Sequence, residues 1–158
     1  MLRKTISLTL CWIMLLTLPA MASANSAITL VINGTTYVDQ QSKVAPYLNQ
    51  DKKLMVPLRA ILLSLPGVDS RSLKWDAAKK EISLIVPDPK GKPLYRLSHK
   101  AGSDTFTING LPISMDSASE IRNNTLYMPL RDVVDAFGAK VHWDGKKQTV
   151  YVTVTNGL

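Results

Sequence analysis

The apolar positions of the chain alternate between a period of two and a period near 3.6, and this order occurs twice. In the first half, residues 28–32 and 35–38 are β-branched and aromatic runs, which predict two strands. Asn33-Gly34 joins them and predicts a tight hairpin, because both residues tolerate positive φ. Residues 54–56 form a further short apolar strand, which ends at Pro57.

A helix is predicted after each of two Pro-Leu-Arg blocks, Pro57-Leu58-Arg59 and Pro129-Leu130-Arg131. Proline fits the first helical position, where its missing N–H would have had no partner. The apolar residues that follow fall at i, i+3, i+4 and i+7, which predicts one buried helical face. They are Leu58, Ile61, Leu62 and Leu65 in the first copy, and Leu130, Val133, Val134 and Phe137 in the second. Pro66-Gly67 and Gly138 end the two helices.

The remaining patterns predict strands and turns. Residues 105–108 and 111–114 flank Asn109-Gly110 as a second hairpin, and Pro112 marks its later strand as an edge. Asn123-Asn124 predicts another tight turn. The polar Pro/Gly cluster at 88–93 predicts a hairpin between strands at 82–86 and 94–97, which ties the two halves into one body.

The spacing of these signals predicts an internal repeat. Asn-Gly recurs from Asn33 to Asn109, Pro-Leu-Arg from Pro57 to Pro129, and Trp-Asp from Trp75 to Trp143, so the offsets are 76, 72 and 68 residues. The second copy is therefore four residues shorter at each interval, and the losses fall in predicted loops. We predict an α+β fold of two pseudo-repeated β-β-α-β units, about 28–87 and 94–155, with antiparallel sheets each packed on a short helix.

The N-terminus has the pattern of a secretory signal peptide. Arg3 and Lys4 precede an apolar run from 6 to 18, and Ala22-Ser23-Ala24 supplies small residues for cleavage. We predict a signal peptide at 1–24 and a mature domain at 25–158, secreted or at the cell surface, without stable membrane insertion. The only cysteine, Cys11, lies in the signal, so the mature chain has no disulfide.

Charge limits the partners. Loss of Arg3 and Lys4 lowers the formal charge from +7 to +5, with 17 basic against 12 acidic residues. This mild, dispersed excess favours loose attraction to an anionic wall or membrane surface. It does not predict nucleic-acid binding, because no basic patch is interleaved with aromatic residues.

The combined motifs resemble the copper amine oxidase-like N-terminal domain, or stalk domain. The closest stretch is residues 137–144, Phe-Gly-Ala-Lys-Val-His-Trp-Asp; residues 65–68 depart from the pattern, with an inserted loop before Trp75. The resemblance covers about residues 28–155. It implies an antiparallel sheet packed on helix, no assigned chemistry, and a place in secreted and surface proteins of Gram-positive bacteria. The catalytic domain that holds copper and a quinone-forming tyrosine is absent, so the resemblance implies no copper binding.

Two arginines and two tryptophans are the candidate contact residues. Arg59 and Arg131 lie near helix N-termini, where the helix dipole disfavours a cation. One interpretation is a structural brace, either to a carboxylate, with Asp76 and Asp144 as candidates, or to strand carbonyls; the other is binding of an anion or ligand.

Trp75 and Trp143 each stand at a predicted strand end beside a turn. One interpretation is closure of the core rim, with the indole N–H satisfied; the other is a platform on which a sugar ring stacks. The aspartate after each tryptophan, Asp76 or Asp144, is predicted to start the turn by accepting backbone N–H groups.

Chemistry-bearing residues are sparse. His99 and His142 are 43 residues apart and lack metal-ligand spacing, so no metal, cofactor or catalytic triad is predicted. Asp132 and Asp135 fit a solvated helix face better than an acid/base pair. The leading hypothesis is a non-catalytic secreted or surface module that binds a protein or a cell-wall polymer. The alternatives are a wall-acting hydrolase or inhibitor, and a small-ligand carrier.

Overall fold

The computed structural model describes residues 28–37, 44–88 and 90–154. The predicted signal peptide lies outside these residues, as does Val38 of the predicted first hairpin. None of the helices in the described ranges is long and apolar enough to cross a membrane.

The described chain is mostly strand, with two short helices. The helices are α1 (Leu58–Leu63) and α2 (Leu130–Ala136). The strands of the first half are β1 (Thr29–Ile32), β2 (Thr35–Tyr37), β3 (Tyr47–Leu48), β4 (Leu54–Pro57), β5 (Leu73–Asp76) and β6 (Glu81–Pro87). Those of the second half are β7 (Pro93–Lys100), β8 (Thr105–Ile108), β9 (Leu111–Ser114), β10 (Glu120–Arg122), β11 (Thr125–Pro129), β12 (Lys140–Asp144) and β13 (Thr149–Thr153).

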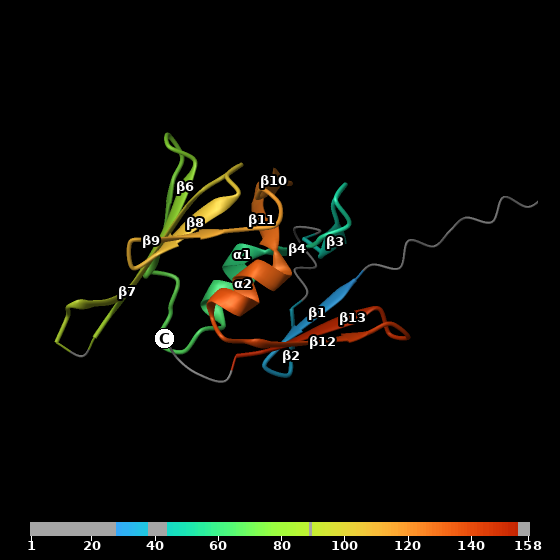
Figure 1. Cartoon of the computed structure of the whole chain (residues 1–158). Coiled ribbons are helices and arrows are strands. Elements are labelled where there is room, and N and C mark those ends of the chain that lie inside the picture. The colour runs from blue at the N-terminus through green and yellow to red at the C-terminus, as the bar shows by residue number, and fades with distance from the viewer. Residues whose placement is uncertain (1–27, 38–43, 89, 155–158) are drawn as a thin grey trace, which may run out of the picture.

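Both predicted helical faces are buried. The eight apolar residues at i, i+3, i+4 and i+7 after the two prolines are each at most 6% exposed. The helices are shorter than predicted, so the i+7 residues Leu65 and Phe137 lie just beyond the ends of α1 and α2. α1 and α2 both contact β4 and β11, and in Figure 1 they lie at the centre of the molecule. Most of this surface belongs to one buried cluster, which also contains Leu30, Leu84, Phe106 and Val150. The helices are therefore held mainly by tertiary packing, because six or seven residues are too few for a helix that is stable alone.

Three sheets surround the helices. The terminal sheet has the strand order β12-β13-β1-β2, the central sheet β10-β11-β4-β3, and the five-stranded sheet β5-β6-β7-β8-β9. Figure 1 shows the terminal sheet on one side of the helices and the five-stranded sheet on the other. The predicted hairpin across 88–93 is confirmed by β6 and β7, which pair antiparallel from Glu81↔Lys100 to Pro87↔Pro93.

The two halves meet in the central sheet. β4 and β11 pair antiparallel with Val56 opposite Met128, and both side chains are at most 1% exposed. This register places the ends of the two Pro-Leu-Arg strands next to each other, so that α1 and α2 start from the same part of the sheet.

The prediction that each unit packs its own sheet on its own helix is wrong. The hairpin of β1 and β2 shares the terminal sheet with β12 and β13, and β5 and β6 share the five-stranded sheet with β8 and β9. β1 and β13 also pair in parallel, Leu30 opposite Val150, where the sequence predicted antiparallel sheets. The physical reason is that a two-stranded hairpin is marginal by itself, so each hairpin adds strands from the other half.

The predicted turns are formed with the expected backbone. Asn33 and Gly34 have φ of 49° and 80°, and Asn109 and Gly110 have 50° and 83°. Positive φ at both central positions is the requirement of a type I′ hairpin. Pro112 lies on β9, an edge strand, as predicted.

Candidate functional site

The Pro-Leu-Arg blocks join strand to helix. Pro57 and Pro129 are the last residues of β4 and β11 and the N-caps of α1 and α2, with extended ψ of 114° and 125°. The sequence analysis predicted that each proline would be the first helical residue, but each is the N-cap, one residue before the helix begins. Leu58 and Leu130 take that position and are buried, so the block fixes where each helix enters the core.

Neither arginine of the blocks forms the predicted brace. Arg59 and Arg131 are exposed, and neither is in an ion pair with the described residues. Asp144 instead accepts the backbone N–H groups of Lys146 and Lys147 at 3.0 and 3.1 Å. In the corresponding turn of the first half, Asp76 accepts those of Ala78 and Lys79 at 3.0 and 3.1 Å. The turn role predicted for both aspartates is therefore formed. Their carboxylates are held by local amides, and the only ion pairs they form within the described ranges are with Lys79 and Lys147, at 3.8 and 3.9 Å.

The tryptophans do not close the core rim as predicted. Trp75 is 47% and Trp143 is 44% exposed, and no hydrogen bond from either indole forms within the described ranges. Trp143 lies opposite the buried Val150 in the β12–β13 pair, so both side chains share the inner face of the terminal sheet. β12 is the edge strand of that sheet, and its inner-face residues Val141 and Trp143 are partly exposed.

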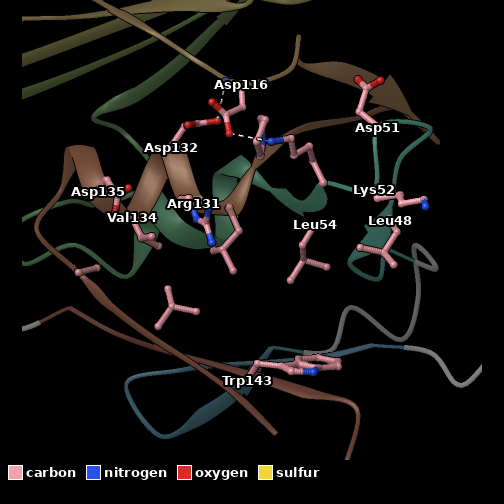
Figure 2. A pocket seen from close by; sticks show the side chains of 15 residues that line it. Leu48, Asp51, Lys52, Leu54, Asp116, Arg131, Asp132, Val134, Asp135 and Trp143 are labelled. Carbon is pink, nitrogen blue, oxygen red and sulfur yellow. Dashed lines mark hydrogen bonds and ion pairs between the residues drawn. The ribbon is translucent and has the colours of Figure 1, made fainter. Parts of the chain in front are cut away.

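This partly exposed face forms one wall of a cleft of about 710 Å³. Val141 and Trp143 of β12 lie on one side, and Leu48, Leu54 and the exposed face of α2 lie on the other. Figure 2 shows the Trp143 ring across the cleft from Arg131 and Leu54. The fold therefore brings together two of the four predicted contact residues, Arg131 and Trp143, whereas Arg59 and Trp75 do not line this cleft.

One ion pair and one hydrogen bond join residues at the upper rim of the cleft. Lys53 Nζ donates to Asp116 Oδ2 at 2.7 Å, and this bond holds the pKa of Asp116 below its usual range. Asp132 accepts the backbone N–H of Asp116 at 3.1 Å. Partial burial raises the pKa of Asp132, and the nearby carboxylates of Asp116 and Asp135 raise it further. Figure 2 shows both contacts as dashed lines. The rim therefore joins the β3–β4 turn to α2 through residues far apart in the sequence.

A second depression adjoins the cleft along β3. Tyr47 donates to Glu120 Oε2 at 2.8 Å, and the guanidinium of Arg122 lies 4.5 Å from the centre of the Tyr47 ring. Burial and the Glu120 carboxylate raise the pKa of Tyr47. Leu48 and Asp51 line both the cleft and this second depression, so the two hollows form one continuous surface. Sequence reasoning missed these residues, because nothing local marks contacts between positions 47 and 120.

The structure does not bring the two histidines together as a metal site. His99 is buried, its Nδ1 donating to the Thr105 carbonyl at 3.1 Å and its Nε2 accepting from Ser119 Oγ at 2.6 Å. Burial lowers the pKa of His99. His142 is exposed, its ring 6.1 Å from that of Tyr151. Among the described residues, no group of three His, Cys, Asp or Glu side chains is placed to hold a metal ion.

The fold and cleft define an α+β module with an open, mixed apolar and charged groove. Comparison with protein families matches residues 31–152 to the copper amine oxidase N-terminal domain. This protein belongs to that family, as its Pro-Leu-Arg and Trp-Asp motifs suggested. None of the curated proteins and none of the solved structures compared with the chain gives a match. The N-terminal domain of copper amine oxidases is a non-catalytic domain.

Proposed function

We propose that this protein is a non-catalytic secreted or cell-surface module that binds a protein or a cell-wall polymer. The cleft carries the proposal, because it exposes the indole of Trp143 and the guanidinium of Arg131, and neither forms a side-chain hydrogen bond or ion pair with the described residues. Trp143 is nearly half exposed on the inner face of a sheet, where apolar side chains are normally covered. Membership of a family whose domain is non-catalytic agrees with a role in binding.

The alternative of a wall-acting hydrolase has less support. A hydrolase needs a nucleophile and a base that the substrate can reach. His99 and Ser119 are in contact, but they are only 1% and 3% exposed and do not line the cleft. Their hydrogen bonds are also engaged by the backbone, since Ser119 Oγ accepts the N–H of Gly102 at 2.9 Å. This pair is better explained as a buried structural network.

A small-ligand carrier is the second candidate. The volume of the cleft, about 710 Å³, falls within the range of small-molecule sites, roughly 300–1,000 Å³. Against this function, such sites bury most of their ligand, whereas Leu48, Val141 and Trp143 leave this cleft open along one side. An extended partner that runs along the groove fits the open shape better.

We also propose that the fold is a pseudo-repeat of two units, with residues 1–24 removed on export. Local backbone features support the repeat: Lys52 and Asn124 both have φ of 58°, and Lys80 and Gln148 have 54° and 49°. These pairs are separated by the same 72 and 68 residues as the sequence motifs. N-terminal sequencing of the exported protein checks the processing. A start near Asn25 is expected, and an intact Met1 would contradict the prediction.

Sedimentation with purified cell walls tests the binding function. We expect the protein to be retained on the walls, or to be cross-linked reproducibly to one envelope protein, and to release no soluble wall fragments. Release of fragments would support the hydrolase instead. Absence of both wall retention and a cross-linked partner would contradict a binding module.

A further inference from the structure

We propose that the cleft binds a neutral, hydroxyl-rich glycan, with one sugar ring stacked on the indole of Trp143. The inference rests on the proposed binding function and names the class of ligand. It depends on three properties of the cleft: a flat exposed aromatic platform, polar side chains that form no hydrogen bond or ion pair with the described residues, and a near balance of charge.

The platform lies on the inner face of β12. Trp143 is 44% and Val141 is 42% exposed, although their cross-strand partners Val150 and Val152 are each 1% exposed. The indole Nε1 lies over the β12–β13 turn, close enough that a Cβ on Gly145 would touch it at 3.4 Å. The ring is thus supported by the turn while it faces the cleft (Figure 2). The apolar C–H face of a sugar ring matches such a surface in shape and polarity.

The polar side chains around the platform have capacity for a ligand. Lys52, Arg131 and Asp135 line the cleft, and their side chains form no hydrogen bond or ion pair with the part of the chain that the structure describes. Ammonium and guanidinium groups only donate hydrogen bonds, and an ionised carboxylate only accepts them. A sugar hydroxyl does both, so hydroxyls spread along a glycan chain can pair with each of the three side chains, which lie along the length of the cleft (Figure 2).

The charge of the cleft favours a neutral ligand. Its lining has three cationic side chains, Lys52, Lys53 and Arg131, and four acidic ones. The acidic residues are Asp51, Asp116, Asp132 and Asp135. A phosphate-rich or carboxylate-rich polymer would meet these acidic groups, and a basic peptide would meet the cations, so either would carry a repulsive contact.

An apolar peptide segment fits less well. It would cover Arg131 and Asp135 without offering side-chain partners, and a buried charge without a partner is costly. A glycan covers the same apolar strip from Leu48 to Trp143 while its hydroxyls hydrogen-bond to the charged rim. The glycan is therefore the occupant that the lining chemistry favours.

Calorimetric titration with a panel of neutral oligosaccharides of N-acetylglucosamine, glucose and mannose tests the proposal. We expect at least one to bind with little salt dependence, because no phosphate or carboxylate is neutralised. Trp143→Ala should weaken that binding on the order of tenfold or more, as truncation of a central aromatic contact does. Trp143→Tyr should restore part of the affinity, since it keeps an aromatic face. Arg131→Met should weaken binding less than Trp143→Ala.

Trp75→Ala is the matched control. Trp75 has the same Trp-Asp sequence and nearly the same exposure, 47%, but it lies on β5 and does not line the cleft. We expect this variant to keep wild-type affinity, and each variant to unfold at a urea midpoint close to that of the wild type.

Several results would overturn the glycan proposal. They are no binding by the whole panel, equal losses in Trp75→Ala and Trp143→Ala, or tighter, salt-dependent binding of an anionic polymer or a peptide. Retention on cell walls that does not depend on Trp143 would refute the glycan site while leaving the proposed binding function intact. If the wild-type protein binds neither cell walls nor an envelope protein, both the glycan site and the proposed binding function are refuted.

Discussion

The hydroxyl of Tyr95 offers a sharp test of the packing. Tyr95 lies on β7, is 5% exposed and packs its ring 6.0 Å from that of Phe137. Its hydroxyl is the buried side-chain polar atom that lacks a hydrogen-bond partner among the described residues. Burial raises the pKa of Tyr95, so the group stays a neutral phenol at every ordinary pH. Tyr95→Phe removes this oxygen and keeps the ring.

The expected effect is a gain in stability. An unsatisfied buried polar group costs about 1–3 kcal/mol, and loss of one oxygen leaves only a small void, so we expect Tyr95→Phe to gain about 1 kcal/mol. For a chain of this size, the gain corresponds to a rise in Tm of roughly 2–5 °C. Urea unfolding measures it, with an unchanged m-value showing that the unfolding reaction is the same.

Tyr47→Phe is the matched control, because the Tyr47 hydroxyl donates to Glu120 at 2.8 Å. This variant should lose stability, by about 1 kcal/mol or less at a partly exposed site. A loss of about 1 kcal/mol or more in Tyr95→Phe would refute the reasoning, because it would mean that the Tyr95 hydroxyl has a partner, such as a bound water.

Three further predictions concern the buried His99, the arginines of the two Pro-Leu-Arg blocks, and the turn residue Asp144. Burial lowers the pKa of His99, so the folded state resists protonation of its imidazole. This contribution to the free energy of unfolding should be fully present above the unfolded pKa of about 6.5. Below that pH, the free energy of unfolding should fall by at most about 1.4 kcal/mol per pH unit. Urea midpoints at several pH values measure this loss of stability, and an unchanged pH dependence of the midpoint in His99→Gln would contradict the role of His99. Arg59→Met and Arg131→Met should each change stability by less than about 0.5 kcal/mol, because neither arginine is in an ion pair with the described residues; a loss above about 1.5 kcal/mol in thermal unfolding would reinstate the brace. Asp144→Ala should cost about 1 kcal/mol, because two turn amides lose their acceptor, whereas Asp144→Asn should keep most of that stability; equal losses would point to charge instead.

Local patterns were sufficient for much of the fold. The i, i+3, i+4, i+7 spacing identified both buried helix faces, since a single helix fixes which residues share a side. Asn33-Gly34 and Asn109-Gly110 identified two hairpins, because positive φ restricts the residue types at those positions. The alternation of Ile82, Leu84 and Val86 identified the buried face of β6, where these residues are at most 7% exposed.

The candidate site was only half visible in the sequence. Arg131 and Trp143 were singled out as possible contacts, together with Arg59 and Trp75, and the repeat gave no means to rank the two pairs. The cleft combines the second pair with Leu48, Lys53 and Asp116, whose contacts join positions more than 60 residues apart. Such contacts depend on sheet packing and leave no local signal.

The sequence by itself determined the elements, their turns, the buried face of each helix and membership of a family, because these depend on neighbours within a few residues. Only the tertiary structure decided how the hairpins combine, since the open edge of a hairpin does not specify which strand will pair with it. That choice placed β1 beside β13 and left β12 at the edge of the sheet, with Val141 and Trp143 partly exposed. The exposure of Trp143, and with it one wall of the cleft, depends on the position of β12 at the edge of the terminal sheet.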